Sequence, residues 1–317
     1  MAFEIPKVKY TGKIKEVTIG TGEKTITIGG ETCYPFHLFE GEIPHVPRIA
    51  FEVWDYEPED WQEWAIEPFK DVIGNPVAWA KKCVDYYKAE IIALQLISAD
   101  PNGMDRDVEE VIKVVKDVVN AVNVPVIVWG TSSDDKDAIL LRRAAEVCEG
   151  KNVVIGPLSE KNYKQIGAMG IAYNHAVLAS SPIDVNLAKQ LNILLGNLGV
   201  KDEKILVDPT TGGLGYGLEY TYSVMERDRM AALTQEDVKL QYPIVCNLAQ
   251  EIWKTKESRL TKNDDPRLGD EKTRSILLES VSAMSLLIAG ADIVIMRHPD
   301  SVALVSEMIR ELMSSGG

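Results

Sequence analysis

The chain has 317 residues, of which 45% are hydrophobic and 26% charged, a composition typical of a globular protein with a large core. Its net charge of 34 − 48 = −14 argues against binding to nucleic acid or to an anionic membrane surface. No apolar stretch reaches the length of about 18 residues that a membrane span requires, and the first residues lack a signal-peptide pattern. We therefore expect a cytoplasmic protein that does not enter the membrane.

The segments at positions 13–20 and 24–30 alternate apolar and polar residues around a Gly-Thr-Gly-Glu turn, which predicts a β-hairpin. An irregular stretch, 34–48, follows it and contains three of the prolines and two of the four histidines. We assign residues 1–47 to an N-terminal extension made of this hairpin and its lead-in.

From position 48 onward, short apolar runs alternate with helical patterns. The expected strands are 49–54, 91–97, 125–129, 152–155, 176–179, 205–207, 243–247 and 293–296. The expected helices are 76–89, 108–122, 135–148, 162–171, 184–198, 219–233, 271–289 and 301–313, and a charged insertion covers 254–270. Eight such units predict a TIM (β/α)₈ barrel over residues 48–317. A doubly wound open sheet is the alternative, but no G-x-G-x-x-G follows an early strand.

Four cysteines, Cys33, Cys83, Cys148 and Cys246, are far apart in the sequence. None forms a C-x-x-C pair or stands near a histidine at metal-ligand spacing. We interpret them as reduced structural residues, and we predict no iron–sulfur cluster and no other metal site in this chain.

In such barrels the functional side chains follow the strands, at the C-terminal face. The residues expected there are mostly hydroxyls, amides, glycines and aspartates, among them Asn102 and Asn247. No nucleophile–histidine–carboxylate pattern is present, so we assign no catalytic residue. His298 is the one histidine at a strand end, where we favour a hydrogen-bonded rim residue over a general base.

The strongest local motif is the loop Asp208-Pro-Thr-Thr-Gly-Gly-Leu-Gly-Tyr-Gly217, with four glycines in its last six residues. Thr210, Thr211, Gly212 and Gly213 are candidates for contact with a ligand or partner, because glycine lets the backbone approach closely. The alternative is a tight turn that needs positive φ. If the first interpretation holds, Gly212→Val should weaken ligand retention with little change in stability.

Three segments, 208–227, 36–50 and 96–102, resemble the small (delta) subunit of the corrinoid iron–sulfur protein. The resemblance implies a (β/α)₈ barrel that forms a heterodimer with a large subunit, which holds the iron–sulfur cluster. It implies a corrinoid (cobamide or cobalamin) shared between the two subunits. It also implies partnership with a methyltetrahydrofolate methyltransferase, which supplies the methyl group, and with acetyl-CoA synthase/CO dehydrogenase, which receives it.

On this basis the residues expected to face the corrinoid are Thr210, Thr211, Gly212, Gly213, Asn102 and Asn247. Only the loop residues are supported by the family motif; the two asparagines follow from their positions at strand ends. A pterin-binding methyltransferase that acts on a corrinoid partner, or a purely structural barrel, remains open. The aromatic residues Trp54, Trp129, Tyr216 and Tyr220 are expected to be exposed until a partner covers them.

Overall fold

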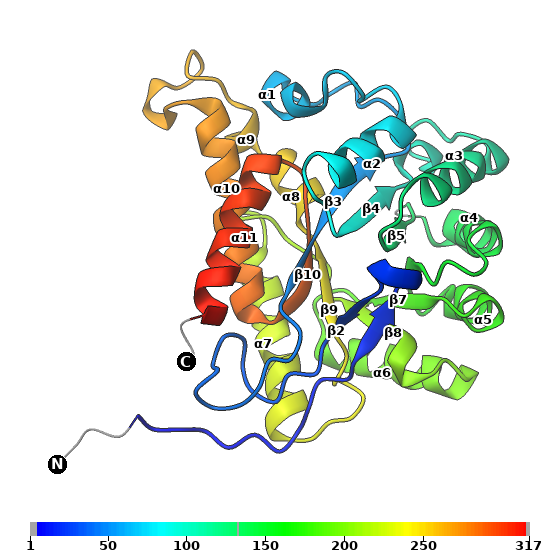
Figure 1. Ribbon diagram of the computed structural model, residues 1–317, viewed down its shortest axis with the longest axis vertical. Helices are drawn as coiled ribbons and strands as arrows, with labels where there is room; N and C mark the ends of the chain where they lie inside the picture. Colours follow the sequence, from blue (N-terminus) through cyan, green and yellow to red (C-terminus); the bar gives the residue numbers. More distant parts are fainter. Residues whose placement is uncertain (1–4, 132, 315–317) are drawn as a thin grey trace.

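The computed structural model describes residues 5–131 and 133–314 (Figure 1). Positions 1–4, 132 and 315–317 lie outside the described residues, and with them the outer ends of the two assigned regions, 1–47 and 48–317.

A closed barrel of eight parallel strands forms the centre of the molecule, with the first and last barrel strands paired to each other. The strands are β3 (Arg48–Trp54), β4 (Ile91–Gln95), β5 (Val126–Trp129), β6 (Val154–Leu158), β7 (Ala176–Ser180), β8 (Ile205–Asp208), β9 (Ile244–Asn247) and β10 (Ala291–Met296). Neighbours in the barrel follow chain order, as expected for a TIM barrel.

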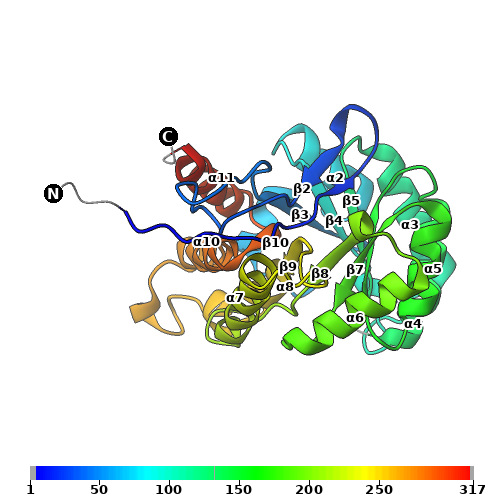
Figure 2. The same cartoon turned by 90° about the horizontal axis from the view of Figure 1, so that it is seen from below.

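Helices surround the strands on the outside, as Figure 2 shows from below. The long helices are α2 (Pro76–Asp85), α3 (Val108–Ala121), α4 (Asp134–Val147), α5 (Tyr163–Tyr173), α6 (Val185–Leu198), α7 (Leu218–Thr234), α10 (Glu271–Ala289) and α11 (Pro299–Ser314). Three short helices, α1 (Glu63–Ile66), α8 (Leu248–Trp253) and α9 (Lys256–Arg259), lie in the loops after β3 and β9.

Each strand is apolar on both sides because it lies between two cores. In β5, Val126 and Val128 pack outward against the helices, whereas Ile127 and Trp129 belong to the core inside the barrel. This explains why the strands appear in the sequence as continuous apolar runs rather than as alternating patterns.

The N-terminal hairpin, β1 (Val17–Ile19) and β2 (Ile26–Ile28), closes the barrel at the N-terminal ends of its strands. Val17, Ile19 and Ile28 are fully buried or nearly so, and they join the inner core of the barrel. Backbone hydrogen bonds from Lys15 to Gln241 and from Gly20 to Asn152 fix the extension to the loops that precede β9 and β6. The extension is therefore the floor of the barrel.

The structure confirms the predicted fold class, including the N-terminal hairpin, and all eight strands and eight long helices lie where the sequence placed them, with ends that differ by a few residues. The three short helices were not predicted. The expectation of exposed aromatics is confirmed for Tyr216 and Tyr220 and is wrong for Trp54 and Trp129, which are buried. None of the described helices is long and apolar enough to cross a membrane.

Candidate functional site

A cavity of about 320 Å³ opens at the C-terminal ends of the barrel strands. Residues from six of the eight strand-end regions line it: Ile97, Asp100, Trp129, Gly130, Thr131, Pro157, Ser180, Asp208, Thr210, Thr211, Asn247, Gln250 and Glu251. These lining residues include no lysine, arginine, histidine or cysteine. The cavity therefore offers hydroxyls, amides and carboxyls around the indole of Trp129.

Three amide side chains form a network at the top of the barrel interior. Gln95 on β4 donates to the Asn247 side chain at 3.1 Å, across the barrel, and accepts from Gln250 at 3.0 Å. Gln95 and Asn247 are buried, whereas Gln250 is half-buried. Because the amides hold one another, Asn247 and Gln250 present fixed donor and acceptor groups toward the cavity.

Asp208 is the buried carboxyl of the cavity. The Ser180 hydroxyl donates to it at 2.7 Å, and the backbone N–H of Thr210 donates at 3.0 Å. Burial raises its pKa to about 6 despite these two hydrogen bonds, and the nearby Glu251 carboxylate acts in the same direction. Asp208 can therefore change protonation state close to physiological pH.

The loop after β8 is folded tightly on itself. The hydroxyl of Thr221 accepts from the N–H of Gly212 and donates to the carbonyl of Thr210, while the carbonyl of Gly213 accepts from Tyr216 and Leu218. A Cβ at Gly212 would lie 2.5 Å from the carbonyl carbon of Gly217. Close packing within the loop is therefore one reason for a glycine at this position, and the approach of a ligand stays a prediction.

Thr210 has a left-handed backbone conformation, with φ of 64°. This conformation costs a β-branched residue free energy, so the surrounding structure must hold it. Its hydroxyl donates to the carbonyl of Ser181, and its backbone donates to Asp208. This strained residue lines the cavity, and strained backbone conformations are often found at functional sites.

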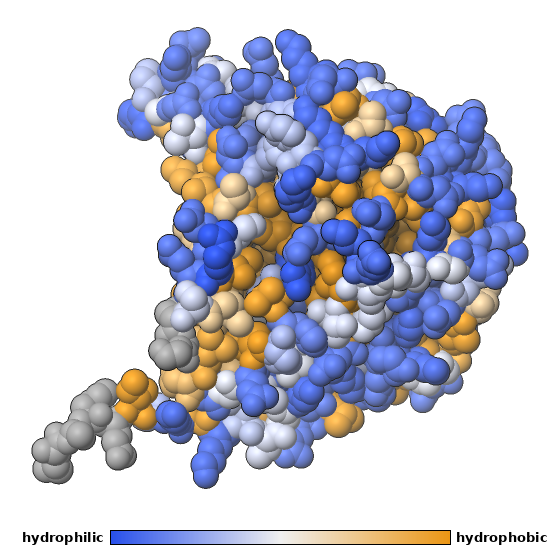
Figure 3. Space-filling view, in the orientation of Figure 1, coloured by the Kyte–Doolittle hydropathy of each residue, from blue (hydrophilic) through white to orange (hydrophobic). Residues whose placement is uncertain are grey.

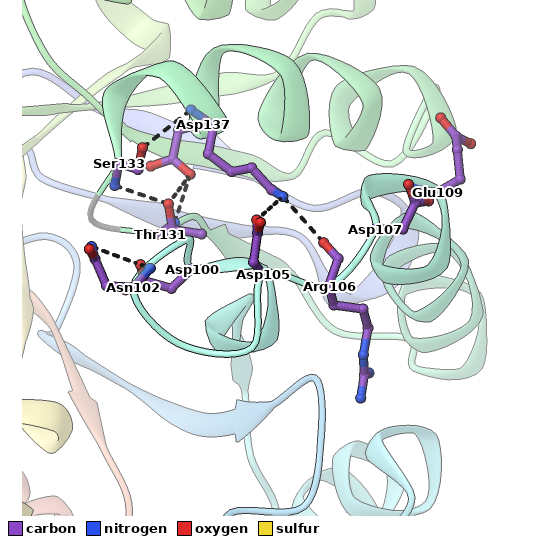
Figure 4. A network of polar contacts seen from close by, with 10 residues as sticks. Asp100, Asn102, Asp105, Arg106, Asp107, Glu109, Thr131, Ser133 and Asp137 are labelled. Carbon is purple, nitrogen blue, oxygen red and sulfur yellow. Dashed lines mark hydrogen bonds and ion pairs between the residues drawn. The ribbon is translucent and has the colours of Figure 1, made fainter.

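On the β5 side, Asp137 at the start of α4 holds the strand end in place (Figure 4). Its carboxylate accepts from the backbone and the hydroxyl of Thr131, and burial raises its pKa to about 7. A Cβ on Gly130 would lie 2.7 Å from the same carboxylate.

Asn102 is exposed, and its backbone and side-chain N–H groups donate hydrogen bonds to the Asp100 carboxylate. It is not among the cavity-lining residues.

A separate buried ion pair joins β3 to the end of β10. Arg297 donates to Glu52 at 2.6 Å, and its guanidinium lies 3.6 Å from the ring centre of Trp61, with the rings of Trp54 and Trp253 also near. None of these residues lines the cavity. The arrangement fixes the junction between the first and last strands.

His298, next to this pair, is buried and accepts a hydrogen bond from the backbone of Asp300. Burial lowers its pKa to about 4, so its imidazole is neutral at physiological pH. It lies away from the cavity lining, which agrees with a hydrogen-bonded rim residue.

The four cysteines are all buried, and burial raises the pKa of each thiol. Within residues 5–131 and 133–314, no group of three or more His, Cys, Asp or Glu side chains could hold a metal ion.

The structure thus separates the six predicted site residues into two groups. Thr210, Thr211 and Asn247 line the cavity, whereas Gly212, Gly213 and Asn102 do not. Sequence reasoning did not single out Gln95 and Gln250. A glutamine in an otherwise apolar strand was the available signal for Gln95; Gln250 stands on a short helix and gave none.

Fold and cavity together define a (β/α)₈ barrel whose mouth, the opening at the C-terminal ends of the strands, is polar and carries carboxyls without a basic side chain. Solved structures of the same architecture include dihydropteroate synthases. The Xanthomonas albilineans enzyme with 4-aminobenzoic acid has a TM-score of 0.61 at 11% identity, over 95% of this chain and 98% of that one. The Coxiella burnetii enzyme in complex with pteroic acid has a TM-score of 0.56 at 13% identity, over 87% and 96%. At these identities the likeness concerns the fold alone.

The sequence relationship is more specific. The family model described as CO dehydrogenase/acetyl-CoA synthase delta subunit matches residues 16–312, and this chain belongs to that family. The acetyl-CoA decarbonylase/synthase complex subunit delta of Archaeoglobus fulgidus is 35% identical over 98% of this chain and 71% of its own length. The Methanopyrus kandleri subunit delta is 36% identical, over 94% and 72%.

Proposed function

We propose that this chain is the small subunit of a heterodimeric corrinoid methyl carrier. Its mouth covers one face of a corrinoid that a large subunit also holds, and the iron–sulfur cluster belongs to that large subunit. The bound cobalt would supply the nucleophile that takes the methyl group from methyltetrahydrofolate through a separate methyltransferase, for delivery to acetyl-CoA synthase/CO dehydrogenase. Membership of the delta-subunit family supports this assembly.

The donor set of the cavity is the observation that carries the proposal. A corrin ring carries amide side chains around its edge, and the Asn247–Gln95–Gln250 network offers matching amide groups in fixed positions. Thr210 and Thr211 add hydroxyls on the neighbouring side. A cavity of about 320 Å³ would take a peripheral amide of the corrinoid rather than the whole ring.

The cavity is better suited to binding than to catalysis. Its lining residues include no cysteine, lysine or histidine that could act as a nucleophile or a strong base. In this assignment Thr210, Thr211 and Asn247 contact the corrinoid. Gly212 and Gly213 shape the loop that carries the threonines, and Asn102 is outside the cavity lining, hydrogen-bonded to the lining residue Asp100.

The test compares the lone chain with the co-expressed heterodimer. We expect the lone chain to be colourless, free of iron and cobalt, and inactive in methyl transfer, because an open mouth covers only one side of a large ligand. Co-expressed with the large subunit, Asn247→Ala should lower cobalt per heterodimer and Asn102→Ala should not. Equal cobalt in both variants would contradict the assignment of the mouth.

A second function is favoured by one observation. The buried Asp208, with its pKa near 6, could pair with the donor and acceptor edge of a pterin, and a solved neighbour binds pteroic acid. A pterin-binding methyltransferase would then act on a corrinoid partner. Calorimetric titration of the lone chain with methyltetrahydrofolate separates the two functions, since stoichiometric binding abolished by Asp208→Ala would support the methyltransferase.

A further inference from the structure

The outer surface of α10 differs from an ordinary surface helix. Between positions 275 and 289 its one charged residue is Glu279, and that side chain is buried. Leu277, Val281 and Ile288 face outward and are 51%, 54% and 49% exposed. By contrast, α3 exposes charged residues along its whole length, as a solvated helix does.

The serines of α10 strengthen this difference. Ser275, Ser280 and Ser282 are buried, and the half-buried Ser285 donates its hydroxyl to the backbone carbonyl of Val281, four residues earlier. A serine bonded in this way offers little to water. Helix α6 is also poor in charge, but it exposes the amides of Asn186, Gln190 and Asn197. The outward side of α10 therefore exposes mainly apolar side chains.

The neighbouring helix α11 extends the apolar surface. Leu304, Met308 and Leu312, spaced four residues apart, are 37%, 41% and 36% exposed. We name the six residues Leu277, Val281, Ile288, Leu304, Met308 and Leu312 the α10–α11 face. Figure 3 shows apolar side chains on the left of the molecule, where these helices lie in Figure 1. An exposed apolar patch that joins two helices marks an interface.

The border of the face is acidic on the α11 side. Glu307 and Glu311 are exposed there, one turn apart. Arg310, the one cation of α11, lines a different cavity at the base of the barrel, together with Arg48 and Tyr87. A second copy of this chain would bring the same acidic border to the contact, whereas a partner with basic residues around an apolar centre would complement it.

We propose that the α10–α11 face docks another subunit of the assembly through an apolar helical surface bordered by lysine or arginine. The inference rests on the proposed heterodimer, and it identifies the large subunit as the occupant. The contact lies on the side of the barrel, outside the cavity lining, so the large subunit reaches the mouth while anchored to α10 and α11. The anchoring surface and the corrinoid surface are therefore distinct.

The test measures association of the purified chain with the purified large subunit by sedimentation velocity and biolayer interferometry. Val281→Glu and Met308→Glu each place a charge in the apolar centre and should weaken association about tenfold or more. Glu311→Lys should weaken it by a smaller factor that shrinks as salt is added. Ile139→Glu is the matched control, because Ile139 is 58% exposed on α4, on the other side of the barrel. All four substitutions are at the surface, and the melting temperature of the lone chain confirms that each variant is folded.

Two outcomes overturn the inference. One is association of Val281→Glu and Met308→Glu that equals the wild type. The other is a lone wild-type chain that is dimeric at micromolar concentration and becomes monomeric with Val281→Glu, which assigns the face to a second copy. Cobalt content separates this inference from the proposed function. Suppose that Val281→Glu abolishes association while Asn247→Ala leaves the cobalt content unchanged. This result supports the docking face and contradicts the corrinoid role of the mouth. A wild-type chain that does not bind the large subunit removes both.

Discussion

Among single residues, Gly212 shows how a motif can be important for a reason internal to the loop. Its Cβ would lie 2.5 Å from the carbonyl carbon of Gly217 and 3.0 Å from the nitrogen of Leu218. We expect Gly212→Ala to lower the free energy of unfolding of the lone chain by about 2 kcal/mol, because the loop backbone must move. Gly103→Ala is the control, since its Cβ would meet no atom closer than 3.6 Å. Equal urea midpoints for the two variants would show that the loop adapts without cost.

Asp208 gives a prediction with a defined pH dependence. Its pKa in the folded protein is about 6, above its ordinary value of 3.8, so folding favours the protonated form. The ionised form therefore costs stability, a cost that is absent below about pH 4, grows as the pH rises, and is complete above about pH 6. A neutral asparagine side chain at this position would carry no such cost and could keep the hydrogen bonds to Ser180 and Thr210.

The variant Asp208→Asn should thus gain stability over the wild type between pH 4 and 6, by on the order of 2–3 kcal/mol, and should show no gain below pH 4. Urea unfolding of both proteins across this pH range measures the difference directly. A difference that does not change with pH would mean that the carboxyl is not desolvated in the folded state.

Among the elements, β3 and β10 depend on a buried ion pair at the point where the barrel closes. The Arg297 and Glu52 side chains are 3% and 0% exposed. We expect Glu52→Leu to destabilise the chain by about 3–5 kcal/mol, since it leaves a buried guanidinium without its carboxylate. The double variant with Arg297→Met should recover most of that loss. Denaturation curves of Glu52→Leu, of Arg297→Met and of the double variant give the coupling energy, and additive losses would show that the pair is not coupled.

The elements also show how far the sequence could predict this molecule. Strands buried on both sides, such as 126–129, give continuous apolar runs, and helices such as 108–121 show strong periodicity. Helices of four to six residues, such as α1, α8 and α9, contain too few turns to show a period. The amide network joins Gln95 to Asn247, which are 152 positions apart in the sequence, and one sequence contains no signal for that contact. Trp129 was misjudged because its side chain belongs to the core inside the barrel, and Trp54 because Trp61, from the loop after β3, packs against its ring.

On the scale of the whole molecule, the N-terminal extension and the barrel share one core, so we expect a single unfolding transition. Ile19→Asp should lower stability by about 3 kcal/mol or more, because it buries an unpaired charge among the residues of the inner core. Thr18→Asp, at the exposed neighbouring position, should have little effect. Calorimetry of both variants is the measurement. Two separate transitions, or loss of the hairpin alone in Ile19→Asp, would show that residues 1–47 fold as an independent domain.

The closed floor of the barrel also has a kinetic consequence. Val17, Ile19 and Ile28 fill the lower end, so in the described part of the chain the inner core separates the cavity at the strand ends from the N-terminal side of the barrel. A group bound in that cavity under a covering subunit could leave only after the subunit moved away. Its residence time could then not be shorter than the time that the assembly takes to open, even where its affinity for the surrounding side chains is low. Exchange of a labelled ligand should for this reason be faster in any variant that loosens the contact between the subunits.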